Sequence, residues 1–358
     1  MRFALMSDSH LHNYSGPQVR INEAGVNSRL QDIIDAMKWM QNIAVERGCD
    51  TIIHGGDLFH SRKSMANEAW EHAAQFMRNM NQAIPTYVLV GNHDYSASGD
   101  GTSTVKALDG LINAVTKVKV IDFSGYKIGF IPYLEDPILV REAVEKLLSK
   151  GAKSLVGHLG IGDPKFSSCV PTDYETPGRI NVSDLSTFEF DQVFLGHYHS
   201  GQPIGDNARY GGSPLQLSFK EAGQVKGLWI FDTDKQKVEF IENKTSPQFH
   251  IIDGAEDKLS SASDLDQAVA SIKDTDFVWL KNVPKGLTES LHKDSEKRLI
   301  PLRIDQAPPV TNTSARITDS ATSDNQVLEE FTRIKAPQIT EEERAALVKV
   351  GLELKESV

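Results

Sequence analysis

The sequence predicts an α/β fold in which two sheets form a sandwich with helices on the outside. Strand-like and helix-like segments alternate from residue 1 to about residue 245, an order typical of a layered core with parallel strand pairing. The 358 residues are enough for one large domain with a smaller companion. Several strands also end abruptly in polar residues, and ligands of open α/β sheets bind just outside such ends.

The first part of this alternation begins with residues 2–7 (RFALMS), which read as a strand. Residues 28–47 form a helical pattern with one apolar stripe, closed by Gly48. The segments that follow are strand 50–57, helix 65–83, strand 86–94, helix 103–115, strands 117–122 and 127–134, helix 138–149, and strands 154–158 and 192–199. Three later segments, 208–214, 227–234 and 237–244, are expected to be antiparallel strands that close a second sheet.

The composition changes near residue 246. A helix at 263–272 and strands at 277–281 and 299–305 predict a small α+β domain over residues 246–306. Residues 307–325 are rich in Ser, Thr, Asn and Pro and predict a linker. Residues 326–358 carry two helical patterns, each with an apolar face. The first face holds Val327, Leu328, Phe331 and Ile334; the second follows a Thr340–Glu343 capping box and holds Leu347, Val350 and Leu354.

Composition limits the classes of protein to consider. The two cysteines, Cys49 and Cys169, are too few for a disulfide framework, which favours a reducing intracellular compartment. The N-terminal apolar run is short and reads as a strand, not as a signal peptide, and no segment approaches the roughly 20 apolar residues of a membrane span. The net charge of −11 argues against broad nucleic-acid binding without bound cations or a basic partner.

Five strand ends carry potential metal ligands. A single histidine after an apolar run is more often a core or rim residue, but five such ends would converge on one edge of the core, which chance explains poorly. The side chains combine hard oxygens with imidazoles and include no thiolate, a set that suits Mn²⁺, Fe or Zn²⁺. The residues are Asp8 and His10, Asp57, Asn92 and His93, His158, and His197 and His199.

These candidates are too many for one ion. A carboxylate can bridge two ions whereas an imidazole cannot, so Asp57 is the natural central ligand of a dinuclear site. Two ions about 3.5 to 4 Å apart clamp a phosphoryl group and lower the pKa of a bridging water. The sequence therefore predicts phosphoester hydrolysis.

The motif series D-x-H, G-D, G-N-H-D, G-H and G-H-x-H resembles the calcineurin-like metallophosphoesterases over about residues 1–245. The resemblance implies that His93 is not a ligand but protonates the leaving oxygen or stabilises the transition state. Asp94 is then expected to orient the His93 ring. The implied ligands are Asp8, His10, Asp57 and His199 for one ion, and Asp57, Asn92, His158 and His197 for the other.

Two further segments narrow the resemblance. GGDLFHSRK (55–63) and RYGGSPLQLSFKEAGQVKGLWIFD (209–232) resemble signatures of SbcD-type recombination and repair nucleases, in a compact, phage-like version. This implies a Mn²⁺-dependent DNA nuclease subunit, exonucleolytic on double strands and endonucleolytic on single strands, in the cytoplasm of a bacterium or an infected host cell.

The same resemblance implies partners. Residues 246–306 lie where the family carries a capping domain that contacts DNA, and residues 326–358 lie where it carries the segment that docks on an SbcC-type coiled-coil ATPase. It also implies a homodimer, with interface helices at 65–83 and 103–115. The alternative for the first of these helices is that Met65, Phe76, Met77 and Met80 face the internal sheet. The terminal helix could likewise pack on the protein's own core.

Other interpretations stay open at this point. A small-molecule or cyclic-nucleotide phosphodiesterase would also carry G-N-H-D, and a metal-binding scaffold without catalysis would keep the fold. His60 either touches the site or caps it in solvent. Arg62 and Lys63 either meet a DNA phosphate or form the solvated start of a helix.

Overall fold

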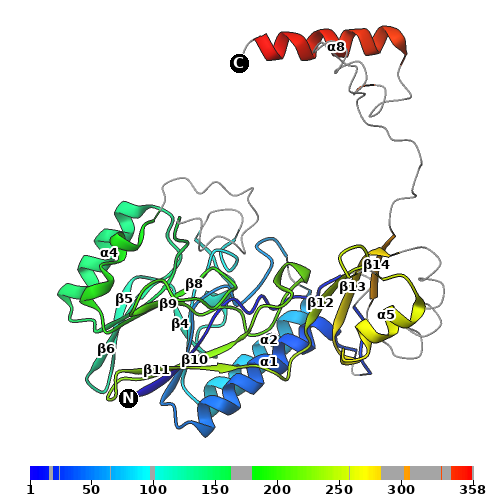
Figure 1. Ribbon diagram of the computed structural model, residues 1–358. Helices are drawn as coiled ribbons and strands as arrows, with labels where there is room; N and C mark the ends of the chain where they lie inside the picture. Colours follow the sequence, from blue (N-terminus) through cyan, green and yellow to red (C-terminus); the bar gives the residue numbers. More distant parts are fainter. Residues whose placement is uncertain are drawn as a thin grey trace. The chain divides into compact units, whose positions relative to one another are not determined.

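The computed structural model describes residues 1–15, 19–23, 25–64, 66–96, 101–162, 180–257, 259–283, 302–306, 332 and 340–356. The chain divides into two compact units, Met1–Ala307 and Pro308–Val358 (Figure 1). Among these described residues, no helix has both the length and the apolar composition needed to cross a bilayer.

Two sheets form the centre of the first unit. The first has the strand order β11-β10-β1-β2-β3-β4, with β1 to β4 parallel and β10 and β11 antiparallel. The second has the order β5-β6-β7-β8-β9 and is parallel except for β5. The first sheet comprises β1 (Arg2–Met6), β2 (Thr51–His54), β3 (Thr86–Leu89), β4 (Asn113–Val115), β10 (Gly227–Asp232) and β11 (Lys237–Glu242). The second comprises β5 (Lys119–Phe123), β6 (Tyr126–Ile131), β7 (Ser154–His158), β8 (Gln192–Gly196) and β9 (Ala208–Tyr210).

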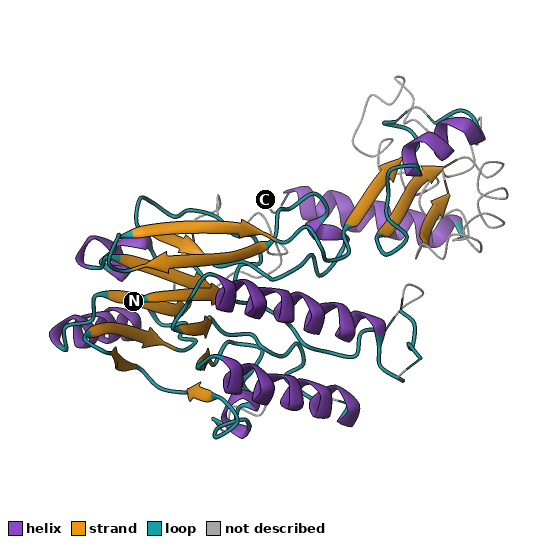
Figure 2. Cartoon of the chain, turned by 90° about the horizontal axis from the view of Figure 1, so that it is seen from below, coloured by secondary structure: helices purple, strands orange, loops and turns teal. Residues whose placement is uncertain are grey.

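The two sheets pack face to face and helices cover their outer faces, which confirms the predicted sandwich (Figures 1 and 2). Phe3, Phe194 and Phe231 meet edge to face or tilted between the sheets. Helices α1 (Ser28–Glu46) and α2 (Asn67–Ala83) cover the first sheet. Helix α4 (Pro137–Ser149) and the short turns η1 (Val182–Leu185) and η2 (Thr187–Glu189) cover the second.

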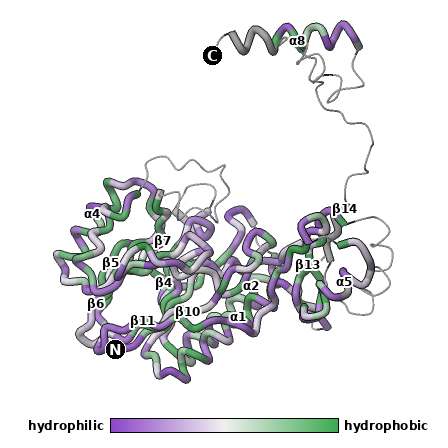
Figure 3. The backbone as a smooth tube through the Cα atoms, in the orientation of Figure 1, coloured by the Kyte–Doolittle hydropathy of each residue, from purple (hydrophilic) through white to green (hydrophobic). Residues whose placement is uncertain are grey.

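Helix α1 shows how local sequence produces this packing. The Asn27 side chain caps its first turn by accepting from the amides of Arg29 and Leu30. The apolar stripe is buried against the sheet, and Figure 3 shows apolar and polar stretches alternating along the helix. The chain leaves the helix through Gly48, whose φ of 62° lies in the left-handed region that glycine adopts at low cost. The predicted helix is thus confirmed.

The helix predicted at 103–115 is wrong. Only one turn forms, α3 (Thr104–Ala107), capped by Ser103, and residues 113–115 become strand β4, where Val115 pairs with Leu89 of β3. Buried side chains at 105, 108, 112 and 115 repeat at helical spacing, which favoured the helix. Gly110, with φ of 90°, turns the chain between the two elements.

The three strands expected to close a second sheet are distributed differently. Strand β9 extends the second sheet but runs parallel to β8. Strands β10 and β11 are antiparallel as predicted, yet they join the first sheet beside β1. This placement puts Phe231 of β10 opposite Phe3 of β1, so that both rings fill the space between the sheets.

A separate sheet of three parallel strands follows the sandwich within the same unit. Its order is β12 (Phe249–Asp253), β13 (Phe277–Val283) and β14 (Leu302–Gln306), and helix α5 (Ala262–Val269) supplies part of its own apolar core. We call β12, β13 and β14 the small sheet. Strand β12 lies outside the predicted strands.

The second unit contains helix α8 (Glu341–Glu356). The predicted capping box is present, since Glu343 accepts from the Thr340 amide at 2.8 Å and Thr340 accepts from the Glu343 amide at 3.3 Å. Leu347 and Val350 of the predicted stripe are each 51% exposed. The predicted linker at 307–325 lies outside the described residues, as does the first terminal helix apart from Thr332.

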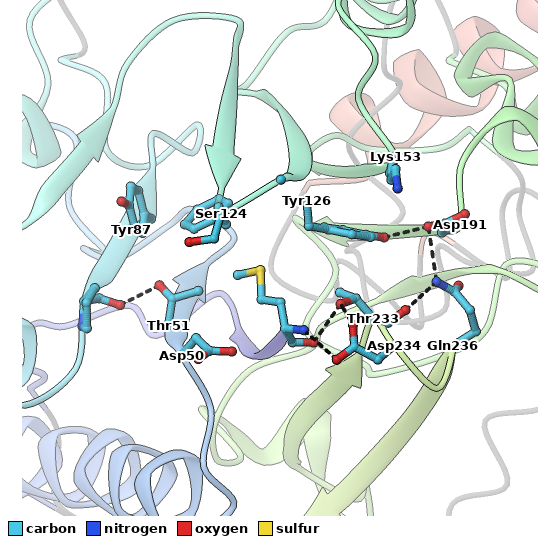
Figure 4. A pocket seen from close by; sticks show the side chains of 14 residues that line it. Asp50, Thr51, Tyr87, Ser124, Tyr126, Lys153, Asp191, Thr233, Asp234 and Gln236 are labelled. Atoms are coloured by element: carbon cyan, nitrogen blue, oxygen red, sulfur yellow. Dashed lines mark hydrogen bonds and ion pairs between the residues drawn. The ribbon is translucent and has the colours of Figure 1, made fainter.

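A cavity of about 680 Å³ lies at the amino ends of the core strands (Figure 4). Its polar side chains are largely paired with one another. The Tyr126 hydroxyl donates to Asp191 at 2.9 Å, and the Gln236 amide donates to the same carboxylate at 3.3 Å. Lys153 lies over the Tyr126 ring, 5.6 Å from its centroid.

Candidate metal centre

The predicted ligands come together at the opposite, carboxyl ends of the strands. Strands β1, β2 and β3 of the first sheet and β7 and β8 of the second each end at one or two of them. The backbone joins the ends directly, because the amides of Asp8 and His10 donate to the carbonyls of Gly56 and Asp57, both at 3.0 Å. The His197 amide donates to Asp8 Oδ1 at 3.0 Å, which links the two sheets.

Asp57 lies at the centre, and its two carboxylate oxygens face different imidazoles. Oδ2 lies 3.7 Å from His10 Nε2, and Oδ1 lies 3.4 Å from His158 Nε2. On the first side, His10 Nε2 faces His199 Nε2 at 3.0 Å, and Asp8 belongs to the same close group. Asp57 thus separates two groups of side chains.

The second group converges on an amide oxygen. Asn92 Oδ1 lies 3.0 Å from His158 Nε2 and 3.0 Å from His197 Nδ1. The structure therefore brings all seven predicted ligand side chains into one cluster. Their assignment to two ions stays a prediction, since Asp8 lies close to His158 as well as to His10 and His199.

Backbone conformation at the cluster is strained. Asp8, His10 and Asp57 have φ of 52°, 50° and 53°, and His197 has φ of 104°. Such left-handed conformations cost a non-glycine residue on the order of 1 kcal/mol or more and persist where surrounding structure enforces them, often at functional sites. Here they turn four side chains away from their strands and into a shared space.

Two glycines allow the strand ends to approach closely. A side chain at Gly56, whose φ is 104°, would collide with the His158 ring, and one at Gly91 would collide with Asp57. The glycines of G-D and G-N-H-D are therefore required for contact between β2, β3 and β7.

Burial and charge set the ionisation of the cluster. Burial disfavours the Asp57 carboxylate, yet attraction to His158 holds the pKa of Asp57 well below its usual range. Burial also works against a charged His158, but Asp57 raises the pKa of His158 to about 9. For His197, burial and the charge of His158 lower the pKa to about 3, so this ring is neutral.

Hydrogen bonds fix the orientation of the imidazoles. His158 Nδ1 donates to the Gly55 carbonyl at 2.8 Å, and His199 Nδ1 lies 2.8 Å from Glu221 Oε1. Lys226 pairs with the other Glu221 oxygen at 2.8 Å. Although burial opposes ionisation of Glu221, His199 and Lys226 lower its pKa to about 2. Partners of this kind fix the ring orientation of metal-binding histidines.

Glu221 was not among the predicted site residues, although it is the last residue of the S-F-x-E segment. The contact between its carboxylate and His199 could not be predicted from sequence, because the two residues lie 22 positions apart in the chain. His54 was also absent from the prediction. It is buried, and its Nε2 lies 2.8 Å from Ser9 Oγ, so that it ties the ends of β1 and β2 together.

Asp94 does not orient His93 as expected. Its buried carboxylate accepts from the backbone amides of Gly91, Phe59 and Leu58 at 2.8, 3.0 and 3.3 Å, which holds the loops after β2 and β3 together. Burial, together with the charge of Asp57, raises the pKa of Asp94 to about 7. The structure instead places the His60 carbonyl 2.7 Å from His93 Nδ1.

His60 touches the cluster, one of the two alternatives raised by the sequence. Its Nδ1 lies 3.3 Å from His10 Nδ1, and its ring stacks on His93 with centroids 5.5 Å apart. Burial and the neighbouring His93 lower the pKa of His60 to about 4. Arg62 and Lys63 follow it as exposed residues before α2. On α2 itself, Met77 and Met80 are buried in the core.

The donor set fits two divalent cations. Buried carboxylates are costly unless a cation compensates them, and in the described part of the chain the ion-pair partners of Asp57 are the imidazoles of His10 and His158. His199 Nδ1 faces the Glu221 carboxylate, which only accepts, so this nitrogen carries a proton and Nε2 of the neutral ring keeps its lone pair. That lone pair points toward His10 Nε2, 3.0 Å away. A lone pair beside buried carboxylates suits the binding of a cation.

Comparisons with known proteins agree with this geometry. Residues 1–201 match the family model of the calcineurin-like phosphoesterases. Exonuclease subunit 1 of Enterobacteria phage T4 is 26% identical over 60% of this chain and 62% of its own length. One subunit of the nuclease SbcCD from Staphylococcus saprophyticus is 28% identical over 63% and 65%, and probable exonuclease subunit 1 of Escherichia phage T5 is 28% identical over 74% and 79%.

The chain thus spans less than two thirds of the length of the phage T4 and Staphylococcus relatives. The family match covers more than half of this chain, from the first strand through all seven clustered side chains. The chain therefore belongs to the calcineurin-like phosphoesterase family.

Proposed function

We propose that this protein is a Mn²⁺-dependent DNA nuclease that hydrolyses phosphodiester bonds, with exonuclease activity on double strands and endonuclease activity on single strands. The observation that carries the proposal is the placement of the Asp57 carboxylate, because its two oxygens face two separate groups of imidazoles. Asp8, His10, Asp57 and His199 would hold one ion, and Asp57, Asn92, His158 and His197 the other.

The ions, when bound, supply charge neutralisation at the phosphodiester and a water of lowered pKa. His93 is the proposed acid. Its Nδ1 lies 2.7 Å from the His60 carbonyl, and since a carbonyl can only accept, that nitrogen carries a proton. The second ring nitrogen, Nε2, then faces the departing sugar oxygen. To act as the acid, His93 would enter the step with both nitrogens protonated, give the Nε2 proton to that oxygen, and remain as the neutral ring with its proton on Nδ1.

DNA as the substrate is supported by the relatives and by the segment after the last histidines. Two relatives are named as exonuclease subunits of phages and one as part of a nuclease. Glu221 of the SbcD-like segment contacts His199. The segment on which the resemblance to nucleases rests therefore reaches the metal cluster. We propose that the small sheet, as part of residues 246–306, contacts DNA beside the cluster.

The proposed partners are a coiled-coil ATPase of the SbcC type and a second copy of this chain. The half-exposed Leu347 and Val350 of α8 support docking of the C-terminal segment on such a partner. Deletion of residues 326–358 should abolish association with the ATPase and spare nuclease activity. Association that survives the deletion would reject this role. The dimer has weaker support, because α2 buries Met77 and Met80 in its own core and 103–115 is largely not helical.

The test of the activity uses end-labelled duplex DNA and circular single-stranded DNA with Mn²⁺, beside the small ester bis-p-nitrophenyl phosphate. The proposal predicts shortening of the duplex and linearisation of the circle. Turnover of the small ester without cleavage of either DNA, alone or with the ATPase partner, would favour a small-molecule phosphodiesterase. No turnover of any substrate with metal bound would favour a scaffold.

A further inference from the structure

The segment 213–221 connects the metal cluster with the small sheet. Its last three residues form one short 3-10 turn, η3 (Phe219–Glu221). The Glu221 end contacts His199 of the cluster at 2.8 Å. The Phe219 end packs its ring on Phe249 of β12 and Trp279 of β13, with centroids 4.8 and 5.5 Å away.

The Glu221 end is held firmly. Besides His199, its carboxylate binds Lys226 at 2.8 Å and accepts from the Leu217 amide at 3.0 Å. Lys226 in turn donates to the His199 carbonyl at 2.7 Å, and Glu221 and Lys226 are both 5% exposed. Glu221 and Lys226 thus form a buried pair that holds the partly exposed His199 ring, whose side chain is 29% exposed. Separating these three groups would leave buried charges without partners, which is costly.

The small sheet is held to the same segment by a second set of contacts. The Phe249 amide of β12 donates to Gln216 Oε1 at 2.7 Å. The Gln216 carbonyl accepts from Arg29 at 3.0 Å, and the Arg29 guanidinium lies over the rings of Phe249 and Phe277, 5.1 and 4.6 Å from their centroids. The buried side chain of Arg29, at the start of α1, thus fastens the first two strands of the small sheet to the core.

A turn of three residues is about 6 Å long and has few backbone torsions that could absorb a movement of its ends. Packed protein interiors also transmit displacement from one side chain to the next. A shift of β12 and β13 relative to the core would therefore act on Phe219, and through the turn on the carboxylate that orients His199.

We infer that docking of the small sheet and metal binding at the cluster are coupled through η3, with Phe219 and Glu221 as positioning residues. The inference rests on the proposed binding of metal. Because coupling between two sites is reciprocal, undocking of the small sheet weakens the metal at His199, and the metal in turn stabilises the docked sheet. A DNA end that displaces or seats the small sheet would then tune the metal site directly.

The first arm of the test uses the unmodified full chain and hydrogen exchange of backbone amides with and without Mn²⁺. Coupling predicts that Mn²⁺ slows exchange at the strand ends of the cluster and also in β12 and β13, most clearly at the Phe249 amide that binds Gln216. Protection that stops at residue 221 would overturn the inference. Absence of Mn²⁺ binding would instead overturn the proposed function, and the coupling with it.

The second arm measures Mn²⁺ affinity by titration in three variants. Phe219→Ala should weaken binding roughly 5-fold or more, the lower range of allosteric couplings, and should abolish the protection of β12 and β13. Phe219→Leu, which keeps an apolar contact, should recover most of both. Phe188→Ala is the matched control, since Phe188 is 88% exposed on η2. Unchanged affinity in a folded Phe219→Ala protein would contradict the coupling.

Discussion

The two ends of the same parallel strands differ in how their polar side chains are used. At the amino ends, the cavity of about 680 Å³ has side chains that bond to each other, such as Tyr126 and Gln236 on Asp191 (Figure 4). At the carboxyl ends, imidazole nitrogens and carboxylate oxygens converge on one another instead.

Backbone strain separates the two ends as well. At the amino ends, positive φ occurs at Ser124 and Gln236, which lie in the turns joining β5 to β6 and β10 to β11, where hairpin geometry calls for it. At the carboxyl ends it occurs at Asp8, His10, Asp57 and His197, where no hairpin requires it. A hollow with paired polar groups and relaxed turns is a surface feature, whereas convergent ligands on a strained backbone indicate a binding site.

The largest expected effect comes from Asp57, the residue shared by both groups. Asp57→Asn should lower the nuclease rate by more than about 10⁴-fold, because loss of metal-based charge stabilisation costs several kcal/mol. Asp191→Asn at the amino ends is the matched control and should leave the rate unchanged. The measurement is cleavage of labelled duplex DNA with Mn²⁺. Similar losses in both variants would break the distinction between the two ends.

The next effect in size is that of His93. His93→Ala should lower the rate by roughly 10² to 10⁴, the usual contribution of a general acid, while metal content stays at two ions per chain. His72→Ala, on α2, serves as a histidine control. Metal analysis beside the cleavage assay distinguishes the two roles of His93, because loss of a metal ligand would lower the metal content whereas loss of an acid would not. A variant that retains full activity would remove His93 from the mechanism.

Glu221 tests whether support of the ligands matters. Glu221→Gln should weaken Mn²⁺ binding roughly 10- to 100-fold, as loss of a partner that orients a metal-binding histidine usually does. The amide keeps the size of the side chain, so the fold should persist in circular dichroism. Titration with Mn²⁺ gives the affinity. Wild-type affinity would mean that the His199 ring is held by packing alone.

The smallest effect is on stability. Mn²⁺ at 100 times its dissociation constant should raise the free energy of unfolding by about 2.7 kcal/mol, because a ligand that binds the native state stabilises it by mass action. A chelator should reverse the gain. Thermal unfolding of the wild type and of Asp57→Asn measures it, and an equal gain in both would show that the ion binds elsewhere.

The seven clustered side chains and His93 could be named from sequence because each lies at the end of an apolar strand or shortly after it. Only the family resemblance set His93 apart from the ligands. Parallel strands bring such ends to one edge, so position along the chain translates into position in space. The helix predicted at 103–115 failed for the converse reason. Val105, Leu108, Ile112 and Val115 have helical spacing, but the last of them is buried by pairing with β3, which is a property of the sheet.

Contacts made by loops could not be predicted. Glu221 contacts His199, and the Asp94 carboxylate accepts hydrogen bonds from three backbone amides. Both contacts require loop conformations that depend on tertiary packing. The pairing of β10 with β1 also could not be predicted. It places Phe231 of β10 among aromatic residues between the sheets, and the hydrophobic pattern of β10 does not indicate which strand it pairs with.

The proposed activity depends on two ions that share Asp57 as a ligand. Metal analysis of the Mn²⁺-loaded chain, combined with electron paramagnetic resonance, measures both their number and their separation. We expect two Mn²⁺ per chain with the spin coupling of ions about 3.5 to 4 Å apart, and loss of that coupling in Asp57→Asn. A single uncoupled Mn²⁺ per chain, or a coupled pair that survives the Asp57→Asn substitution, would contradict this expectation.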